Sequence, residues 1–185
     1  LASFIGLWVG YAWFARFWGM RTPSLMATTQ RYRRLWMLQS TARDPRVLDG
    51  IITQSLSNNP SFLASTSILV IGGLAAMLGT TDKAAEIVRE IPFAEATPLL
   101  VFEFKILVLI SIFVFAFFRF TWSIRQYVIA GVVIGAMPSH KEFERAERGE
   151  GGAPPLDREG VANRVANLLA LAADTFNDGL RAYYF

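Results

Sequence analysis

The chain has 185 residues, of which 53% are hydrophobic, 14% aromatic and 18% charged, and its mean hydropathy is +0.35. About a quarter of the residues of an ordinary soluble domain are charged, so the composition favours a membrane protein. The absence of cysteine excludes disulfides, iron–sulfur clusters, thiolate zinc sites and covalently attached c-type haem. The one histidine, His140, excludes a bis-histidine haem, and the sequence predicts no cofactor and no metal site.

Three apolar stretches have about the length of a membrane-spanning helix: residues 1–18, 60–79 and 98–118. The second carries no charged residue, and the third carries only Glu103 and Lys105 near its start. As helices they would be about 27–32 Å long, which matches a hydrocarbon core of about 30 Å. Buried helices of a soluble protein are the alternative, but an uncharged run between polar segments favours three transmembrane helices.

The charges differ between the two sides of these spans. The basic residues before position 50 are Arg16, Arg21, Arg31, Arg33, Arg34, Arg43 and Arg46, and those after Phe118 are Arg119, Arg125, Lys141, Arg145, Arg148, Arg158, Arg164 and Arg181. Residues 80–97 hold only Lys83 and Arg89, against four acidic residues. By the positive-inside rule, residues 19–59 and 119–185 are cytoplasmic, while the N-terminus and the loop or short helix at 80–97 face outward. We therefore expect a multi-pass membrane protein.

The cytoplasmic segment 19–59 predicts two amphipathic helices. The first has Leu25, Tyr32, Leu35 and Trp36 at helical spacing, and the second begins at Asp44-Pro45, since aspartate is a favoured N-cap and proline suits the first helical position. At the other end of the chain, the basic Arg181 precedes an aromatic cluster, as often occurs where a span enters the membrane. We therefore expect a fourth transmembrane helix beyond Phe185.

Residues 119–138 predict a cytoplasmic extension of the third span, because neither proline nor a turn cluster separates the two. A re-entrant segment is the alternative. The extension contains apolar residues that need cover in water, among them Val128, Ile129 and Val132. Residues 139–155 form a charged linker, and residues 156–185 an amphipathic helix that starts at Leu156 or Asp157. The expected fold is all-α, with a cytoplasmic helical bundle beneath the membrane spans.

Four residues of the third span and its extension carry charge or an interfacial ring: Glu103, Arg119, Trp122 and Arg125. Trp122 lies three residues from each arginine, which permits cation–π contacts. Arg119, Trp122 and Arg125 predict an interfacial anchor or, in an oligomer, a basic pore mouth. Glu103 predicts a side chain that reaches toward the outer headgroups or, alternatively, an ion site within the membrane.

Small residues recur along one face of the second span at Ser65, Gly72, Ala76 and Gly79, and this spacing predicts close helix packing within or between subunits. The basic cluster Arg31, Arg33 and Arg34 predicts contact with acidic lipid headgroups, although topology alone also explains it. The formal net charge is only +3, which gives little support for nucleic-acid binding.

Three strings carry a family resemblance: FLASTSILVIGGLAAMLG (62–79), FVFAFFRFTWSIRQYVIAGVVIGAMP (113–138) and FNDGLRAYYF (176–185). Together with RYRRLWM (31–37) they resemble an uncharacterised family of bacterial and plant membrane proteins, family five-nine-nine of the domains of unknown function. The resemblance implies an integral membrane protein of four helices, and we expect it in the bacterial inner membrane. It implies no activity, cofactor or catalytic residue.

Two functions remain open from the sequence. The first is a non-enzymatic interaction or accessory component of a membrane assembly, whose partners are membrane lipids and either a second copy or a larger complex. The alternative is a homo-oligomeric channel or transporter with a basic cytoplasmic mouth. An enzyme is not expected, because no nucleophile has a histidine partner on the same element and any acid–base chemistry would depend on isolated carboxylates.

Overall fold

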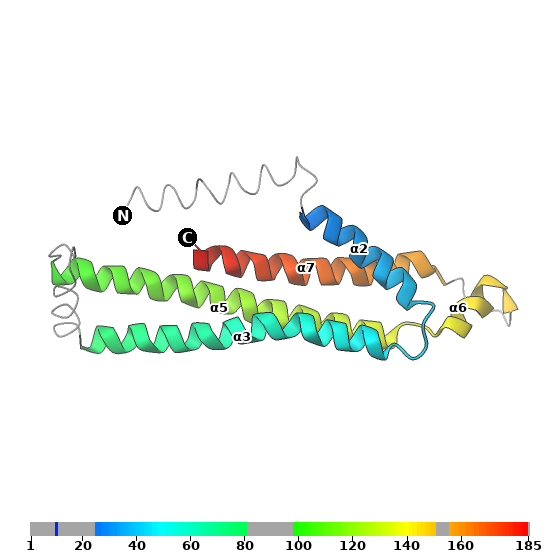
Figure 1. The fold of residues 1–185 in the computed structure, drawn as a ribbon, viewed down its shortest axis with the longest axis horizontal. Coiled ribbons are helices and arrows are strands. Elements are labelled where there is room, and N and C mark those ends of the chain that lie inside the picture. The colour runs from blue at the N-terminus through cyan, green and yellow to red at the C-terminus, as the bar shows by residue number, and fades with distance from the viewer. Residues whose placement is uncertain (1–9, 11–24, 81–97, 151–155, 185) are drawn as a thin grey trace.

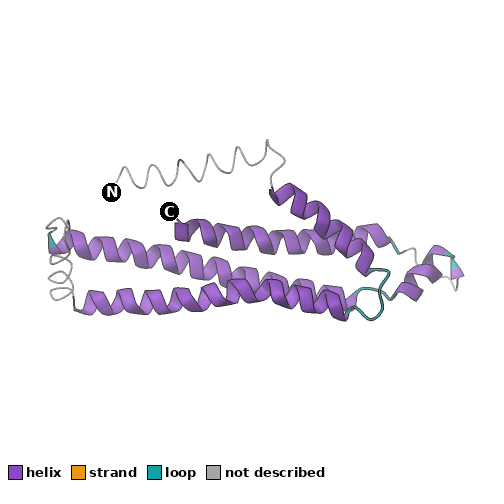
Figure 2. Ribbon diagram, viewed as in Figure 1, coloured by secondary structure: helices purple, strands orange, loops and turns teal. Residues whose placement is uncertain are grey.

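The structure, a computed structural model, describes residue 10 and residues 25–80, 98–150 and 156–184. This part of the chain is all-α and contains no strand (Figure 2). Its helices are α2 (Leu25–Ser40), α3 (Val47–Gly79), α5 (Leu99–Ala136), α6 (His140–Glu147) and α7 (Arg158–Tyr184). The expected first span at 1–18 and nearly all of the expected outer loop at 80–97 lie outside the described residues.

Helix α5 is the centre of the arrangement, since it packs against both α3 and α7, and α2 packs on α7. Both α3 and α7 run antiparallel to α5 (Figure 1). The outer halves of α3 and α5 extend beyond the C-terminal end of α7, so in this part of the described chain they pack only against each other (Figure 1). We call this two-helix part the outer part, and the rest, in which α7 packs on α5 and α2 packs on α7, the inner part.

The face of α3 that meets α5 is made of small and polar residues. Its buried positions recur every three or four residues, at Thr53, Ser57, Pro60, Ala64 and Ser67. Pro60 lies inside the helix without ending it. The boundary expected at residue 59/60 is therefore not a helix end, because the amphipathic helix and the span behind it form one helix of 33 residues.

Helix α5 is continuous over 38 residues, about 57 Å, so the third span and its extension are one helix, without a re-entrant turn. In its inner half, Tyr127, Ala130 and Ile134 are buried against α7 and α2. Val128, Ile129 and Val132 are exposed. The expected cover of these three residues is thus absent from the described chain, because α3 and α7 occupy only one side of α5.

Three local expectations need correction. Helix α3 begins at Val47 rather than at Pro45, and its N-cap residue, Arg46, makes no side-chain capping bond. The segment expected as a linker contains helix α6, which Ser139 and Glu142 cap by the reciprocal bonds of a capping box. Tyr32 of α2 is exposed because α2 turns a different side, which includes Met37, toward α7.

Helix α7 follows its predicted pattern more closely. The Asp157 carboxylate accepts a hydrogen bond from the Gly160 backbone N–H at 2.9 Å and so caps the helix. All members of the predicted apolar stripe are buried or half-buried: Val161, Val165, Leu168, Leu169, Ala172, Phe176 and Leu180. The members of this stripe up to Ala172 join Tyr127, Ala130 and Ile134 of α5 and Met37 of α2 in the inner core, whereas Phe176 and Leu180 pack around Phe120 of α5.

Two helices of the described chain, α3 and α5, are long and apolar enough to cross a membrane. Only 11% of the residues in the most apolar 18-residue window of each are buried within the protein. The core helix of a soluble protein would be mostly buried, so the exposure of these windows distinguishes them from such a helix.

Candidate functional site

Helices α5 and α7 make a close contact at the end of the apolar span. Phe120 of α5 is fully buried, and its ring lies over Gly179 of α7. A Cβ atom added at Gly179 would be 2.6 Å from Phe120 Cε1, so only glycine fits at this position without displacing the ring. Phe176 and Tyr183 hold the ring from two sides, at centroid distances of 5.7 and 5.3 Å. This contact fixes the register of the two helices.

The register places a charged group beside that contact. Arg119 precedes Phe120, Asp178 precedes Gly179, and the Arg119 guanidinium donates from Nη2 to Asp178 Oδ2. Arg181 Nη1 donates to the other oxygen, Asp178 Oδ1, at 3.4 Å. All three side chains are partly exposed: 34% for Arg119, 38% for Asp178 and 43% for Arg181. We call Arg119, Asp178 and Arg181 the boundary cluster.

The predicted cation–π contacts form in part. The Arg125 guanidinium lies over the Trp122 ring at 5.7 Å, and both side chains are exposed. Arg119 does not stack on Trp122 but lies over Phe115 at 6.0 Å, because its guanidinium turns toward Asp178 and the N-terminal side of its own helix. Arg119 and Arg125 therefore have different surroundings, one paired with a carboxylate and one exposed on an indole ring.

A second polar contact links α7 to α3 one turn farther along. The Tyr183 hydroxyl lies 2.5 Å from Ser67 Oγ and donates to the Leu63 backbone carbonyl at 3.2 Å. Ser67 Oγ also donates to Leu63 O at 2.7 Å, as expected for a serine within a helix. The Tyr183 ring packs on Phe113 of α5, at a centroid distance of 5.0 Å. Tyr183 thus joins all three helices.

The other predicted residues of the span do not gather with the boundary cluster. Glu103 is half-buried near the outer end of α5, far along the helix from Arg119. The predicted packing face of α3 is turned away from α5: Ser65, Gly72, Ala76 and Gly79 are exposed, and Cβ atoms added at Gly72 and Gly79 would meet nothing within 4 Å. The packing face that the described chain uses is the one that contains Ala64 and Ser67.

The basic cluster of α2 is split. Arg31 and Arg34 are exposed, whereas Arg33 is half-buried on the side that faces α7. Desolvation by neighbouring protein atoms raises the pKa of Asp174 on α7, although this residue is largely exposed, and the positive charge of Arg33 opposes that shift. Arg33 thus interacts with α7, and only Arg31 and Arg34 remain directed at the surroundings for the predicted lipid contact.

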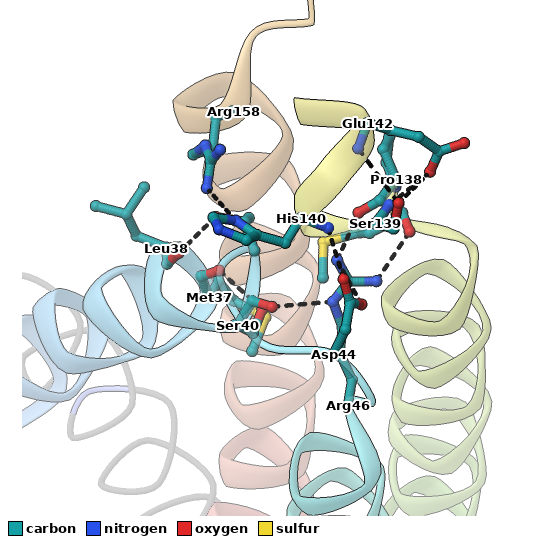
Figure 3. Close-up of polar contacts among 12 residues, drawn as sticks. Met37, Leu38, Ser40, Asp44, Arg46, Pro138, Ser139, His140, Glu142 and Arg158 are labelled. Atoms are coloured by element: carbon teal, nitrogen blue, oxygen red, sulfur yellow. Dashed lines mark hydrogen bonds and ion pairs between the residues drawn. The ribbon is translucent and has the colours of Figure 1, made fainter. Parts of the chain in front are cut away.

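A polar junction at the inner end of the bundle had no counterpart in the sequence reasoning. Arg46 donates to the backbone carbonyls of Ser40 at 2.9 Å, Met137 at 2.9 Å and Pro138 at 2.5 Å (Figure 3). It thereby joins the C-terminal ends of α2 and α5, whose last carbonyls have no partner within their helices. Asp44 accepts from the His140 backbone N–H at 2.7 Å, so it caps α6 rather than α3.

The second buried polar group of this end is Asp49. Its side chain is fully buried, and Oδ1 accepts from Trp36 Nε1 at 2.7 Å and from Arg43 Nη2 at 2.9 Å. These bonds hold the turn between α2 and α3. The only sequence signal for Arg46 and Asp49 is their position: Arg46 lies in the short turn between α2 and α3, and Asp49 lies in the first turn of α3.

The chemistry available in the described residues is that of charge and hydrogen bonding. No group of three or more His, Asp or Glu side chains gathers there where it could hold a metal ion. His140 is bound into the junction, with Nε2 at 3.1 Å from Glu144 Oε1 and Nδ1 at 3.5 Å from Arg158 Nη1. The boundary cluster and the exposed Trp122 and Arg125 are suited to binding an anion or a polar surface.

Comparison with known proteins identifies a family but no characterised relative. No curated protein and no solved structure matches the chain at a significant level. The sequence profile of one family, described as "Protein of unknown function, DUF599", matches residues 1–185. This agrees with the resemblance of the four strings in the sequence, and the chain therefore belongs to the DUF599 family.

Proposed function

We propose that the protein is an integral membrane protein that acts as a non-enzymatic interaction or accessory component of a membrane assembly. The observation that carries the proposal is the exposed apolar surface of α3 and α5. Large apolar side chains that are at least half exposed include Phe62, Ile68, Leu69, Leu100, Phe104, Leu107, Phe115 and Phe118. Soluble proteins rarely expose apolar patches this extensive, whereas a bilayer removes such side chains from water.

The inner edge of the proposed membrane lies where both helices change character. On α5 the phenylalanine-rich stretch ends at Arg119, and Trp122 follows at a position typical of the interface. On α3 the exposed residues of the two turns before Phe62 are polar, Gln54, Ser55, Asn58 and Asn59, whereas Val47, Leu48 and Ile51 are exposed near the start of the helix. Since the arginine-rich segments belong to the inner part, the positive-inside rule favours a cytoplasmic location for that part.

The interaction role is supported by the exposed seam of α3. Ser65, Leu69, Gly72, Ala76 and Gly79 follow one another at intervals of four and three residues, and none is buried by the described chain. Small residues at such intervals allow another helix to approach closely, and van der Waals packing is a main source of helix association in lipid. Lipid chains could also cover the seam, so the partner must be tested directly.

The channel alternative has less support. A basic mouth needs arginines whose charge is available to the pore, but Arg119 is paired with Asp178, which also accepts from Arg181. Arg125 alone remains exposed on α5 at this level. Ion flux in liposomes that changes with Arg125→Gln would nevertheless favour a channel over the proposed role.

The membrane topology can be tested by single cysteines, because the natural chain has none. We expect a membrane-impermeant maleimide to label Thr80→Cys from outside in spheroplasts, and to label Gln54→Cys only after the membrane is permeabilised. Leu69→Cys, which is 77% exposed in the protein but would face lipid or a partner, should react poorly in both cases. Labelling of Thr80→Cys and Gln54→Cys from the same side would refute the proposed topology.

The interaction role needs a separate experiment. A photo-crosslinker at Ala76 should give a discrete protein adduct, whereas one at Phe104, on the exposed side of α5, should give lipid adducts only. Purification in mild detergent should recover the adduct partner in a fixed ratio to the chain. If both positions give lipid adducts only and the protein purifies alone, the accessory role is refuted while the membrane location stands.

A further inference from the structure

The boundary cluster has an unbalanced charge at the edge of the apolar zone. It combines two guanidinium groups with one carboxylate, and the neighbouring Asp174 is balanced by Arg33, so the net charge here is +1. The adjacent turn of α5 toward the outer side is apolar, with exposed Phe115 and Phe118. A charge beside hydrocarbon is unfavourable unless a counter-charge lies close to it.

We infer that Arg119 and Arg181 bind the phosphate group of an anionic membrane lipid on the surface where α5 and α7 meet. This inference deepens the proposed function and rests on it. A lipid phosphodiester carries one negative charge, which neutralises the +1 of the cluster. Guanidinium groups bind phosphate with two parallel hydrogen bonds, and basic sites between helices on the cytoplasmic side of a membrane are suited to anionic headgroups.

The two arginines differ in how firmly the protein holds them. Arg119 is held by Asp178 and lies over Phe115, so its orientation is fixed by the protein. Arg181 is the more exposed of the two and makes the longer contact with Asp178, 3.4 Å. Arginine has five N–H donors, and Arg181 uses one of them in the contacts of the described chain, so it has donors to offer a phosphate.

The surface beside the cluster suits the rest of a lipid. Phe115 and Phe118 are 50% and 63% exposed toward the apolar zone and can contact acyl chains. Trp122, 52% exposed, lies on the same helix at headgroup level. A zwitterionic lipid carries its own ammonium group, which competes with arginine for its phosphate, so the site should prefer phosphatidylglycerol to phosphatidylcholine.

The test is lipid retention by the whole protein, measured by native mass spectrometry in detergent micelles that contain phosphatidylglycerol or phosphatidylcholine. We expect Arg181→Gln to lower the apparent affinity for phosphatidylglycerol about fivefold, which corresponds to ~1 kcal/mol for one basic residue near a surface. Arg181→Lys should retain most of the affinity. Arg164→Gln is the matched control, because Arg164 is an exposed arginine of α7 about 25 Å from Arg181 along the helix.

Three results would overturn the inference. Equal losses in Arg181→Gln and Arg164→Gln would show that total charge, and not this site, determines binding. Equal retention of the two lipids would remove the anionic preference. If inorganic phosphate at ~10 mM displaces phosphatidylglycerol, the site binds soluble anions rather than lipid. A protein that fails the cysteine-labelling test refutes the proposed function instead.

Discussion

Replacing Gly179 with alanine tests the contact that sets the register of α5 and α7. The new Cβ would lie 2.6 Å from Phe120 Cε1 and 2.8 Å from Cδ1, distances at which one of the two helices or the ring must move. The ring has little room to do so, since it is fully buried and packs against Phe176 and Tyr183. Overpacking of this kind typically costs about 1–3 kcal/mol.

The matched control is Gly131→Ala on α5. A Cβ atom there would meet only Thr53 Cγ2 at 3.8 Å, which is ordinary van der Waals contact. Both substitutions gain helix propensity, up to ~1 kcal/mol for alanine over glycine. The difference between the two variants therefore isolates the clash, and we expect Gly179→Ala to be less stable than Gly131→Ala by about 1–3 kcal/mol.

Thermal unfolding in detergent, followed by far-UV circular dichroism, measures this difference. At roughly 2–4 °C for each kcal/mol, Gly179→Ala should melt several degrees below Gly131→Ala. Adding Phe120→Leu to Gly179→Ala should recover part of the loss, because the smaller side chain leaves room for the new Cβ. If Gly179→Ala is as stable as Gly131→Ala, the ring of Phe120 does not lie over Gly179 and the described register is wrong.

Three further predictions concern the inner end of the bundle. Arg46→Ala should lower the free energy of unfolding by about 2–4 kcal/mol, because three backbone carbonyls lose a charged donor. In the same thermal assay Arg46→Lys should recover only part of this loss, since the single ammonium group of lysine cannot span three acceptors. Asp49→Asn should cost about 2–3 kcal/mol, because it breaks an ion pair whose acidic member is buried, and should change the fluorescence of Trp36, its hydrogen-bond donor. Hydrogen bonds from the Ser139 backbone N–H and hydroxyl lower the pKa of Glu142 in the folded protein. The stability that this carboxylate contributes is therefore present above its pKa in the unfolded chain and is lost as the pH falls through its lower pKa in the folded protein. In an NMR titration the Ser139 amide resonance should shift as this carboxylate titrates, and Glu142→Gln should abolish that shift.

Sequence periodicity predicts the buried face correctly for a helix that buries one continuous stripe. Helix α7 packs one stripe against α5 and α2, so its apolar spacing of three and four residues predicted the buried face. Helix α2 has a short contact with α7 and leaves Tyr32 and Leu35 exposed, although both are apolar and correctly spaced. Which side of a short helix is buried depends on where its neighbour lies, and its own spacing carries no information on that.

The site could be predicted only as separate residues. Arg119 was singled out by its place at the end of an apolar run, but its partner Asp178 is 59 residues away, and nothing in the sequence pairs the two. The small residues of α3 show a similar limit. Two seams of small residues run along this helix, and the one that packs on α5 contains Thr53, Ser57 and Pro60 rather than the glycines, a choice that the spacing alone does not determine.

The two parts of the fold depend on different physical forces. In the inner part, α2, α5 and α7 bury Val165, Leu169, Ile134 and Met37 in a core that water would otherwise reach, so the hydrophobic effect stabilises it. In the outer part, α3 and α5 leave most of their side chains exposed, and in lipid, where we propose that this part lies, the burial of apolar side chains would bring no comparable gain. Helix α7 is held on α5 and α3 by close packing and polar contacts, Phe120 on Gly179, Arg119 with Asp178 and Tyr183 with Ser67, and these contacts lie where the two parts meet. Because α3 and α5 continue through both parts, a substitution at this level should change how α7 packs on them and so lower the stability of the inner part.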